Sequence, residues 1–98
     1  MSIYTPKLIN GVVTTAATRV KLASSSTTFR LATIQANAGN GGTIYIGDVT
    51  VSSSVYGIAL PKGASIAIGA SGNDPNFDLT QFYADTSNSG DGFSILYF

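Results

Sequence analysis

Hydrophobic and polar residues alternate along most of the chain, and residues that favour turns interrupt the alternation about every ten positions. Such alternation is typical of β-strands that bury one face, and short strands at this spacing are typical of a sandwich or barrel. The pattern therefore predicts an all-β protein, a small antiparallel β-sandwich of jelly-roll-like form with about seven to nine strands. The clearest strands are expected at 18–23, 27–37, 43–49, 55–60, 64–69 and 93–98.

The beginning of the chain has two interpretations. Asn10 and Gly11 lie between two pairs of apolar residues, and they are a strong hairpin signal because both central residues of a type I′ turn need a positive φ. Residues 1–11 are therefore expected to form either an N-terminal arm or the first strand of a hairpin. Residues 12–98 are expected to form a single β-sandwich domain, since a chain of 98 residues rarely supports two cores.

Two further segments leave alternatives open. Within 27–37, Phe29 and Leu31 share one face, whereas Ile34 falls out of step with them, which predicts a bulge or a strand buried on both sides. Within 78–85, the spacing of the apolar residues fits either a strand or a single helical turn.

The last strand has apolar residues on both faces, with Phe93, Ile95 and Tyr97 on one face and Leu96 and Phe98 on the other. A strand at the surface of a monomer normally has one polar face. It is therefore predicted either to lie centrally between two layers or to pack on a neighbouring subunit as well as on its own core. Because chain termini fray unless they are docked, the terminal aromatic residue also favours a homo-oligomer. We expect a trimer more than a dimer.

The composition limits the chemistry that the chain can perform. Ser, Thr, Gly and Asn make up 40 of the 98 residues, and the sequence contains no Cys, His, Trp or Glu. Disulfides, thiolate nucleophiles, imidazole bases and most transition-metal sites are thereby excluded. Without His no Ser-His-Asp relay can form, and we expect neither an enzyme nor a bound cofactor.

Charge is sparse and unevenly distributed. The net charge is zero, which argues against nucleic-acid or anionic-membrane partners, and no apolar run approaches the about 20 residues of a membrane-spanning helix. Residues 1–47 carry four basic residues and no acidic one, whereas residues 48–98 carry Lys62 and all five Asp. Either antiparallel pairing interleaves these halves, or the subunit has a basic and an acidic edge suited to contacts between subunits.

Two features are candidate binding sites for small ligands. Residues from Asp85 to Asp91 are spaced like the start of a calcium loop, but Leu96 stands where such a loop needs an acidic residue. A turn without metal is the simpler interpretation; if a metal binds, we expect calcium, held weakly by Asp85 and Asp91. The second feature is a set of tyrosines that are candidate platforms for sugars: Tyr4, Tyr45, Tyr56 and Tyr83.

Five segments follow one another in an order of strands and turns: 43–48 (TIYIGD), 50–54 (TVSSS), 57–63 (GIALPKG), 78–85 (DLTQFYAD) and 92–98 (GFSILYF). In this order they resemble a group of small all-β virion proteins of tailed bacteriophages, of the capsid decoration (cement) or head-fibre type. The resemblance extends over residues 12–98. It implies a decoration subunit that binds the outer shell and bridges subunits of the major capsid protein. The alternative is a phage tail or fibre component with a glycan-binding β-sandwich.

For such a role we expect partner contacts near the two ends of the chain. The N-terminal candidates are Ile3, Tyr4, Pro6 and Lys7, and the C-terminal candidate is Phe98. A basic set is the next candidate: Arg19, Lys21 and Arg30. The protein is expected to be made in the host cytoplasm and to reside on the capsid surface of the virion.

Overall fold

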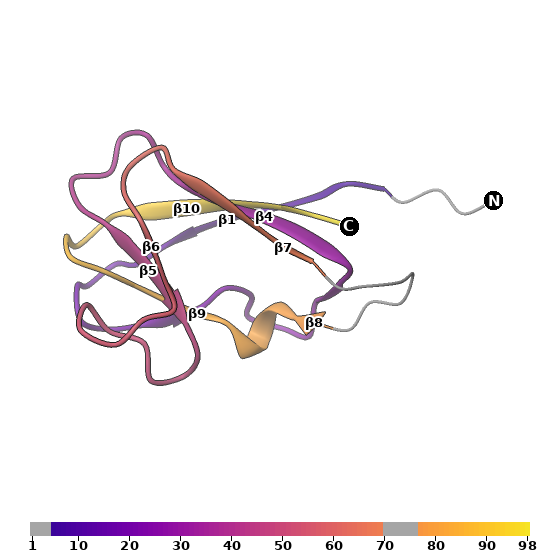
Figure 1. The fold of residues 1–98 in the computed structure, drawn as a ribbon, viewed down its shortest axis with the longest axis horizontal. Helices are drawn as coiled ribbons and strands as arrows, with labels where there is room; N and C mark the ends of the chain where they lie inside the picture. Colours follow the sequence, from indigo (N-terminus) through magenta and orange to yellow (C-terminus); the bar gives the residue numbers. More distant parts are fainter. Residues whose placement is uncertain (1–4, 70–76) are drawn as a thin grey trace.

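The computed structural model describes residues 5–69 and 77–98, and this part of the chain is built from β-strands (Figure 1). The prediction of an all-β protein with antiparallel sheets is confirmed. The described residues form ten strands and one 3-10 turn, so the predicted number of strands is too low. Three strands have two residues each and are too short to produce an alternation in the sequence: β2 (Val20–Lys21), β3 (Thr28–Phe29) and β8 (Phe77–Asp78). No helix in the described residues is long and apolar enough to cross a membrane.

Two four-stranded sheets form the layers of a sandwich. In spatial order, sheet A consists of β1 (Lys7–Val12), β10 (Gly92–Tyr97), β4 (Leu31–Ala36) and β7 (Ser65–Gly69). Sheet B consists of β2, β9 (Tyr83–Thr86), β5 (Ile44–Gly47) and β6 (Ile58–Leu60). Strands β3 and β8 pair with each other in a separate two-stranded sheet.

The pairing between strands is nested. Strands of the first half pair antiparallel with those of the second half in reverse order: β1 with β10, β2 with β9, β3 with β8, β4 with β7 and β5 with β6. The chain is thus one long hairpin, turned between β5 and β6 and folded into two layers. Additional pairing of β10 with β4 and of β9 with β5 completes the two sheets. The first and last strands consequently lie side by side (Figure 1).

The hydrophobic core lies between the two sheets. Phe93 and Ile95 of β10 point into it, together with Ile34 of β4 and with Ile44 and Ile46 of β5, and all five are buried. Burying a side chain of this size contributes about 2 kcal/mol relative to leaving it in water. Alternation along β5 and β10 therefore places their core residues as the sequence predicts.

The last strand has apolar residues on both faces, as predicted, but its two faces have different surroundings. Phe93 and Ile95 are in the core, whereas Leu96 points away from it and is 40% exposed. Strand β10 lies centrally within sheet A, between β1 and β4. Within the described residues no second layer covers its outer face, so β10 is central in its sheet but does not lie between two layers.

The shift of phase near Ile34 comes from a break between two strands. Phe29 belongs to β3 and is fully buried, whereas Leu31 begins β4 and is 39% exposed, so the prediction that they share a face is wrong. The chain leaves the small sheet at Arg30 and enters sheet A. Neither a bulge nor burial on both sides is needed, because the two halves of this segment belong to different sheets.

Both alternatives for residues 78–85 occur, one after the other. Asp78 ends β8 and caps the 3-10 turn η1 (Leu79–Gln81), where its side chain accepts a hydrogen bond from the amide of Thr80. The chain then continues into β9. The buried Leu79 anchors the turn to the core.

Asn10 and Gly11 do not form the predicted hairpin turn. They lie inside β1, where they pair with Ser94 and Phe93 of β10. A Cβ on Gly11 would clash with Cζ of Phe93, because the aromatic ring lies over the glycine. Glycine is therefore required here for space under a cross-strand aromatic ring and not for a positive φ.

Replacing Gly11 by alanine is expected to lower the free energy of unfolding by about 2 kcal/mol, because the Phe93 ring must leave its packed position. Gly39→Ala is the matched control, since no heavy atom lies within 4 Å of a Cβ there and its φ is outside the left-handed region. Its effect should stay below about 0.5 kcal/mol. Urea denaturation measures both variants, and equal losses would contradict the packing of Phe93 over Gly11.

Candidate interaction surface on sheet A

One regular surface of the described residues is the side of sheet A that faces away from the core. Because side chains alternate along each strand, every second residue of the four strands points outward. We call this surface the outer face. It consists of Leu8, Asn10, Val12, Leu31, Thr33, Gln35, Ser65, Ala67, Gly69, Ser94 and Leu96.

The strand register arranges the outer face in rows. One row runs across all four strands from Leu8 through Leu96 and Thr33 to Ala67, and it is almost entirely apolar. The neighbouring row contains only amides and hydroxyls: Asn10, Ser94, Gln35 and Ser65. An apolar row beside a row of hydrogen-bonding groups is typical of protein-binding surfaces, where both kinds of contact are needed.

The outer face has no charged side chain. The only charged residue in the four strands of sheet A is Lys7, whose position in the alternation does not belong to the outer face. Its ammonium lies 6.0 Å from the centre of the Tyr97 ring. Two of the outward apolar side chains are highly exposed, Leu8 at 73% and Val12 at 54%. Lack of charge together with exposed large apolar side chains is typical of the central part of protein interfaces.

The structure brings part of the predicted contact set together at one end of sheet A. Pro6 directly precedes β1, whose Lys7 pairs with Tyr97, and the amide of Phe98 donates to the carbonyl of Leu31 at 2.9 Å. The amide of Arg30 in turn donates to the carbonyl of Phe98 at 2.8 Å. Pro6, Lys7, Arg30 and Phe98 therefore lie near the same end of the sheet. The other two predicted residues, Ile3 and Tyr4, lie outside the described residues.

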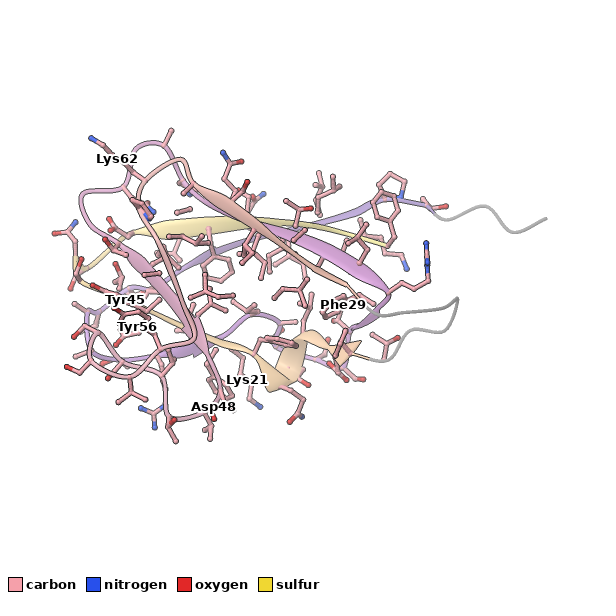
Figure 2. All side chains as sticks on the ribbon, viewed as in Figure 1. Lys21, Phe29, Tyr45, Asp48, Tyr56 and Lys62 are labelled. Carbon is pink, nitrogen blue, oxygen red and sulfur yellow. The ribbon has the colours of Figure 1, made fainter. Side chains whose placement is uncertain are left out.

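The predicted basic set is not one patch. Lys21 (labelled in Figure 2) is an exposed residue of β2 and pairs with Tyr83 in sheet B, whereas Arg30 directly precedes β4 of sheet A. Arg19 lies close enough to Asp48 to help lower the pKa of that carboxyl, which is held down chiefly by hydrogen bonds from the hydroxyl and amide of Thr50. A basic residue of the first half thus lies beside an acidic one of the second, which favours interleaved charges over separate basic and acidic edges.

Asp91, a calcium candidate, holds two loops together. Its side chain is 4% exposed; Oδ1 accepts a hydrogen bond from the amide of Gly41 at 2.9 Å, and Oδ2 accepts one from the amide of Gly42 at 2.8 Å. Asn88 and Thr86 donate to it as well. Burial raises the pKa of Asp91, but the hydrogen bonds from Gly41, Asn88 and Gly42 outweigh it and bring the pKa below its ordinary value. Donors occupy both oxygens, so the carboxylate serves as an acceptor for backbone groups.

The second calcium candidate, Asp85, has a similar structural role. Its Oδ1 accepts hydrogen bonds from the amides of Thr86 at 2.8 Å and of Ala17 at 3.0 Å. Ala17 has a φ of 68°, a left-handed conformation that is unfavourable for a residue with a side chain. Asp85 therefore helps to hold a strained turn against β9. Within residues 5–69 and 77–98 no three acidic side chains gather as metal ligands.

Asp78 joins η1 to the segment before β3. Its Oδ1 accepts from the amides of Thr27 and Thr80, both at 3.0 Å, and its Oδ2 accepts from the hydroxyl of Ser26 at 2.7 Å. The amide of Thr27, together with the other donors, holds the pKa of Asp78 far below its ordinary value. Asp78, Asp85 and Asp91 thus each connect segments far apart in the sequence, as disulfides do in other small proteins.

A second surface of chemical interest lies at the loop between β5 and β6. The rings of Tyr45 and Tyr56 lie side by side with centroids 4.9 Å apart, and Tyr56 is 50% exposed (Figure 2). Beside Tyr56 is a hollow of about 290 Å³, lined also by Asp48, Thr50 and Val55. Of the predicted sugar platforms, Tyr83 lies on β9 and is half-buried, and Tyr4 lies outside the described residues.

The sequence analysis missed most of the outer face. Leu8 and Val12 were hidden because Asn10 and Gly11 suggested a turn between them. Polarity does not alternate regularly in this segment, where Leu8 and Ile9 are both apolar, so only the pairing with β10 reveals one strand.

Comparisons of the chain with protein-family models, with curated proteins and with solved structures found no match.

Acid is expected to weaken the fold by protonating Asp78 and Asp91. The pKa of each is lower in the folded protein than the ordinary value of 3.8, so between these values the unfolded chain binds more protons. Their stabilisation is therefore fully present above the unfolded-state pKa and is lost as the pH falls below it. In Asp91→Asn, the decrease in the free energy of unfolding from about pH 6 to about pH 3 should be smaller than in the wild type. Urea denaturation at the two pH values measures it, and an equal decrease in both proteins would contradict the assignment.

Proposed function

We propose that the protein is a structural component of a bacteriophage virion, a decoration subunit on the outer surface of the capsid. In this role it binds the shell and bridges neighbouring subunits of the major capsid protein, without catalysis and without a cofactor. The observation that carries the proposal is the outer face of sheet A, a regular surface without charge that exposes Leu8, Val12 and Leu96 to water.

The outer face offers a partner a preformed surface with both apolar and hydrogen-bonding side chains. Four adjacent antiparallel strands form the outer face. The hydrogen bonds on both sides of β10 and β4 hold the backbone of these strands, and therefore the positions of their side chains, in place. A preformed surface loses little conformational entropy on binding, which leaves more of the contact energy for affinity. The row of Asn10, Ser94, Gln35 and Ser65 supplies hydrogen-bonding groups that define the orientation of the partner.

The strand order supports the same class of protein. In a jelly roll, a long hairpin folds into two four-stranded sheets, and its first and last strands lie side by side. The nested pairing and the orders β1-β10-β4-β7 and β2-β9-β5-β6 fit that description, and we infer a jelly-roll-like sandwich. Jelly rolls are frequent in viral capsid proteins and in lectins. This support is an analogy at the level of the fold, since one fold hosts many functions.

The size of the protein fits a bridging role. The chain exposes 5469 Å² of surface, and a standard contact covers about 800 Å² of each partner. One subunit can therefore contact more than one neighbour. Each contact contributes a few kcal/mol after the cost of association, and many copies over a shell add these contributions together. The same surface also permits self-association, and we include a homo-oligomer in the proposal.

The test is the composition of virus particles. Particles are purified on a density gradient from lysates of the organism that encodes the chain, and quantitative mass spectrometry gives the ratio of this protein to the major capsid protein. We expect many copies per particle, and we expect Leu8→Lys to lower this number at least about tenfold, because a charge in the apolar row would be buried without a partner.

Val55→Lys is the matched control, since Val55 is 56% exposed on the loop between β5 and β6 and lies outside the outer face. It should retain normal occupancy, and thermal melting should show that both variants are folded. Absence of the wild-type protein from particles would refute the proposal. Equal numbers of the two variants per particle would show that the outer face does not bind the shell.

A second candidate function rests on the paired tyrosines. We propose as the alternative a tail or fibre component that binds glycans at the hollow beside Tyr56. Sugars stack on exposed aromatic rings, and the side chains of Asp48 and Thr50 line the same hollow and carry oxygens for sugar hydroxyls.

Glycan-array binding distinguishes the two functions. If the alternative holds, the wild type binds defined glycans and Tyr56→Ala loses the signal, while Leu8→Lys retains it. The loss should be at least about tenfold, since stacking on one aromatic ring contributes more than about 1 kcal/mol. An array without signal for the wild type would refute this alternative.

A further inference from the structure

Within residues 5–69 and 77–98, no strand pairs with one edge of sheet A, the free side of β1. Among the described residues, β1 pairs only with β10. The amide of Val13 donates to the carbonyl of Asp91 at 2.8 Å, and backbone groups of successive residues in an antiparallel ladder point to opposite sides. The amides and carbonyls of Leu8, Asn10 and Val12 therefore point away from β10, toward the open edge.

This edge lacks the features that normally prevent strands from pairing. Soluble proteins protect edge strands by making them short, by placing charges or Pro within them, or by bulges. Strand β1 has six residues, its register with β10 is regular, and its only charge is Lys7 at the first position. The edge strands of sheet B, in contrast, have only two residues (β2) and three residues (β6).

We propose that two copies of the chain associate through this edge, with β1 antiparallel to β1 of the second copy about a two-fold axis at Asn10. In this register Leu8 faces Val12 of the other copy, and Asn10 faces its own equivalent. All three residues with open backbone groups are then matched, which gives about six inter-strand hydrogen bonds. Other antiparallel registers leave at least one of these residues unmatched.

The side chains are self-complementary in the same register. The two most exposed large apolar residues of sheet A, Leu8 at 73% and Val12 at 54%, become cross-strand neighbours on the outer face. On the inner side Ile9 faces Gly11 of the other copy, where it meets the Phe93 ring that lies over this glycine. The two Lys7 ammonium groups lie at opposite ends of the paired strands, with their backbones about 20 Å apart, so like charges do not oppose pairing.

The surroundings of β1 add contact area. A hollow of about 320 Å³ runs between β1 and the segment 20–27, and Ile9, Val20 and Phe93 contribute to its lining. A second copy paired on β1 brings its own segment 20–27 to the same side of the sandwich. Six residues of strand alone fall short of the about 800 Å² per partner of a stable interface, so this segment is part of the proposed contact.

Single cysteines test the register, because the chain has no native Cys. Asn10→Cys places two thiols at the two-fold axis, where the Cα atoms of a hydrogen-bonded pair are about 5.5 Å apart and a disulfide can form. Ser94→Cys is the matched control on the neighbouring strand of the same outer-face row. Its Cα atoms would be about 14 Å apart across three strand spacings, too far for a disulfide. Under mild oxidation, non-reducing electrophoresis should show a covalent dimer for Asn10→Cys only.

Proline variants test the edge in the otherwise native protein. Asn10→Pro removes an amide that does not bond to β10, so the monomer should fold, but the pairing should weaken at least about tenfold. Ala67→Pro is the matched control on the opposite edge strand, β7, where the same alternation leaves the amide of Ala67 unbonded to β4. Circular dichroism checks folding, and analytical ultracentrifugation measures the mass against 10.1 kDa for one chain.

A dimer that Asn10→Pro dissociates and Ala67→Pro leaves intact supports the proposal. A monomer at all concentrations, a trimer, or dissociation by Ala67→Pro would overturn it, as would equal cross-linking of the two cysteine variants. These measurements use the purified protein without virus particles. Failure of β1 pairing therefore leaves the particle-binding proposal standing, and absence from particles leaves the dimer standing.

Discussion

The nested antiparallel pairing of the chain is the constraint on which the other features of the structure depend. Because β1 pairs with β10 and each later strand pairs with its counterpart, the first and last strands form half of sheet A. Pairing on both sides of β10 fixes which of its side chains enter the core and which point outward. It also leaves β1 at the edge of the sheet, with one side unpaired among the residues that the structure describes. The core, the outer face and the open edge are therefore consequences of the same ladder.

Carboxylate and amide side chains at the loops connect segments that are far apart in the sequence. At the loops, the carboxylates of Asp78, Asp85 and Asp91 accept hydrogen bonds from amides on distant segments and hold the connections in place. Asn40 acts in the same way, since its side-chain amide exchanges two hydrogen bonds, each of 2.9 Å, with the backbone of Gly92. Buried acceptors that are fully paired stabilise loops at low cost. The charges needed for this task are thus kept away from the outer face of sheet A.

The outer face and the open edge of β1 share residues, which connects the two proposals physically. Leu8, Asn10 and Val12 contribute side chains to the face and backbone groups to the edge. Pairing through the edge would extend one uncharged face across two subunits, so that a partner would meet a surface twice as wide. Binding two linked sites raises avidity without any new kind of contact.

The sequence by itself determined the all-β class and the core positions of the regular strands, such as Ile44 and Ile46, because alternation is a local property of an extended backbone. It also excluded His- and Cys-based chemistry. Tertiary structure alone decided the role of Gly11, since the ring that requires it belongs to Phe93 at the far end of the chain. The break at Arg30 and the meeting of Pro6 with Phe98 near one end of sheet A were likewise hidden. They depend on which strands pair, and pairing between distant strands is set by the packing of the whole chain, which no local pattern of residues contains.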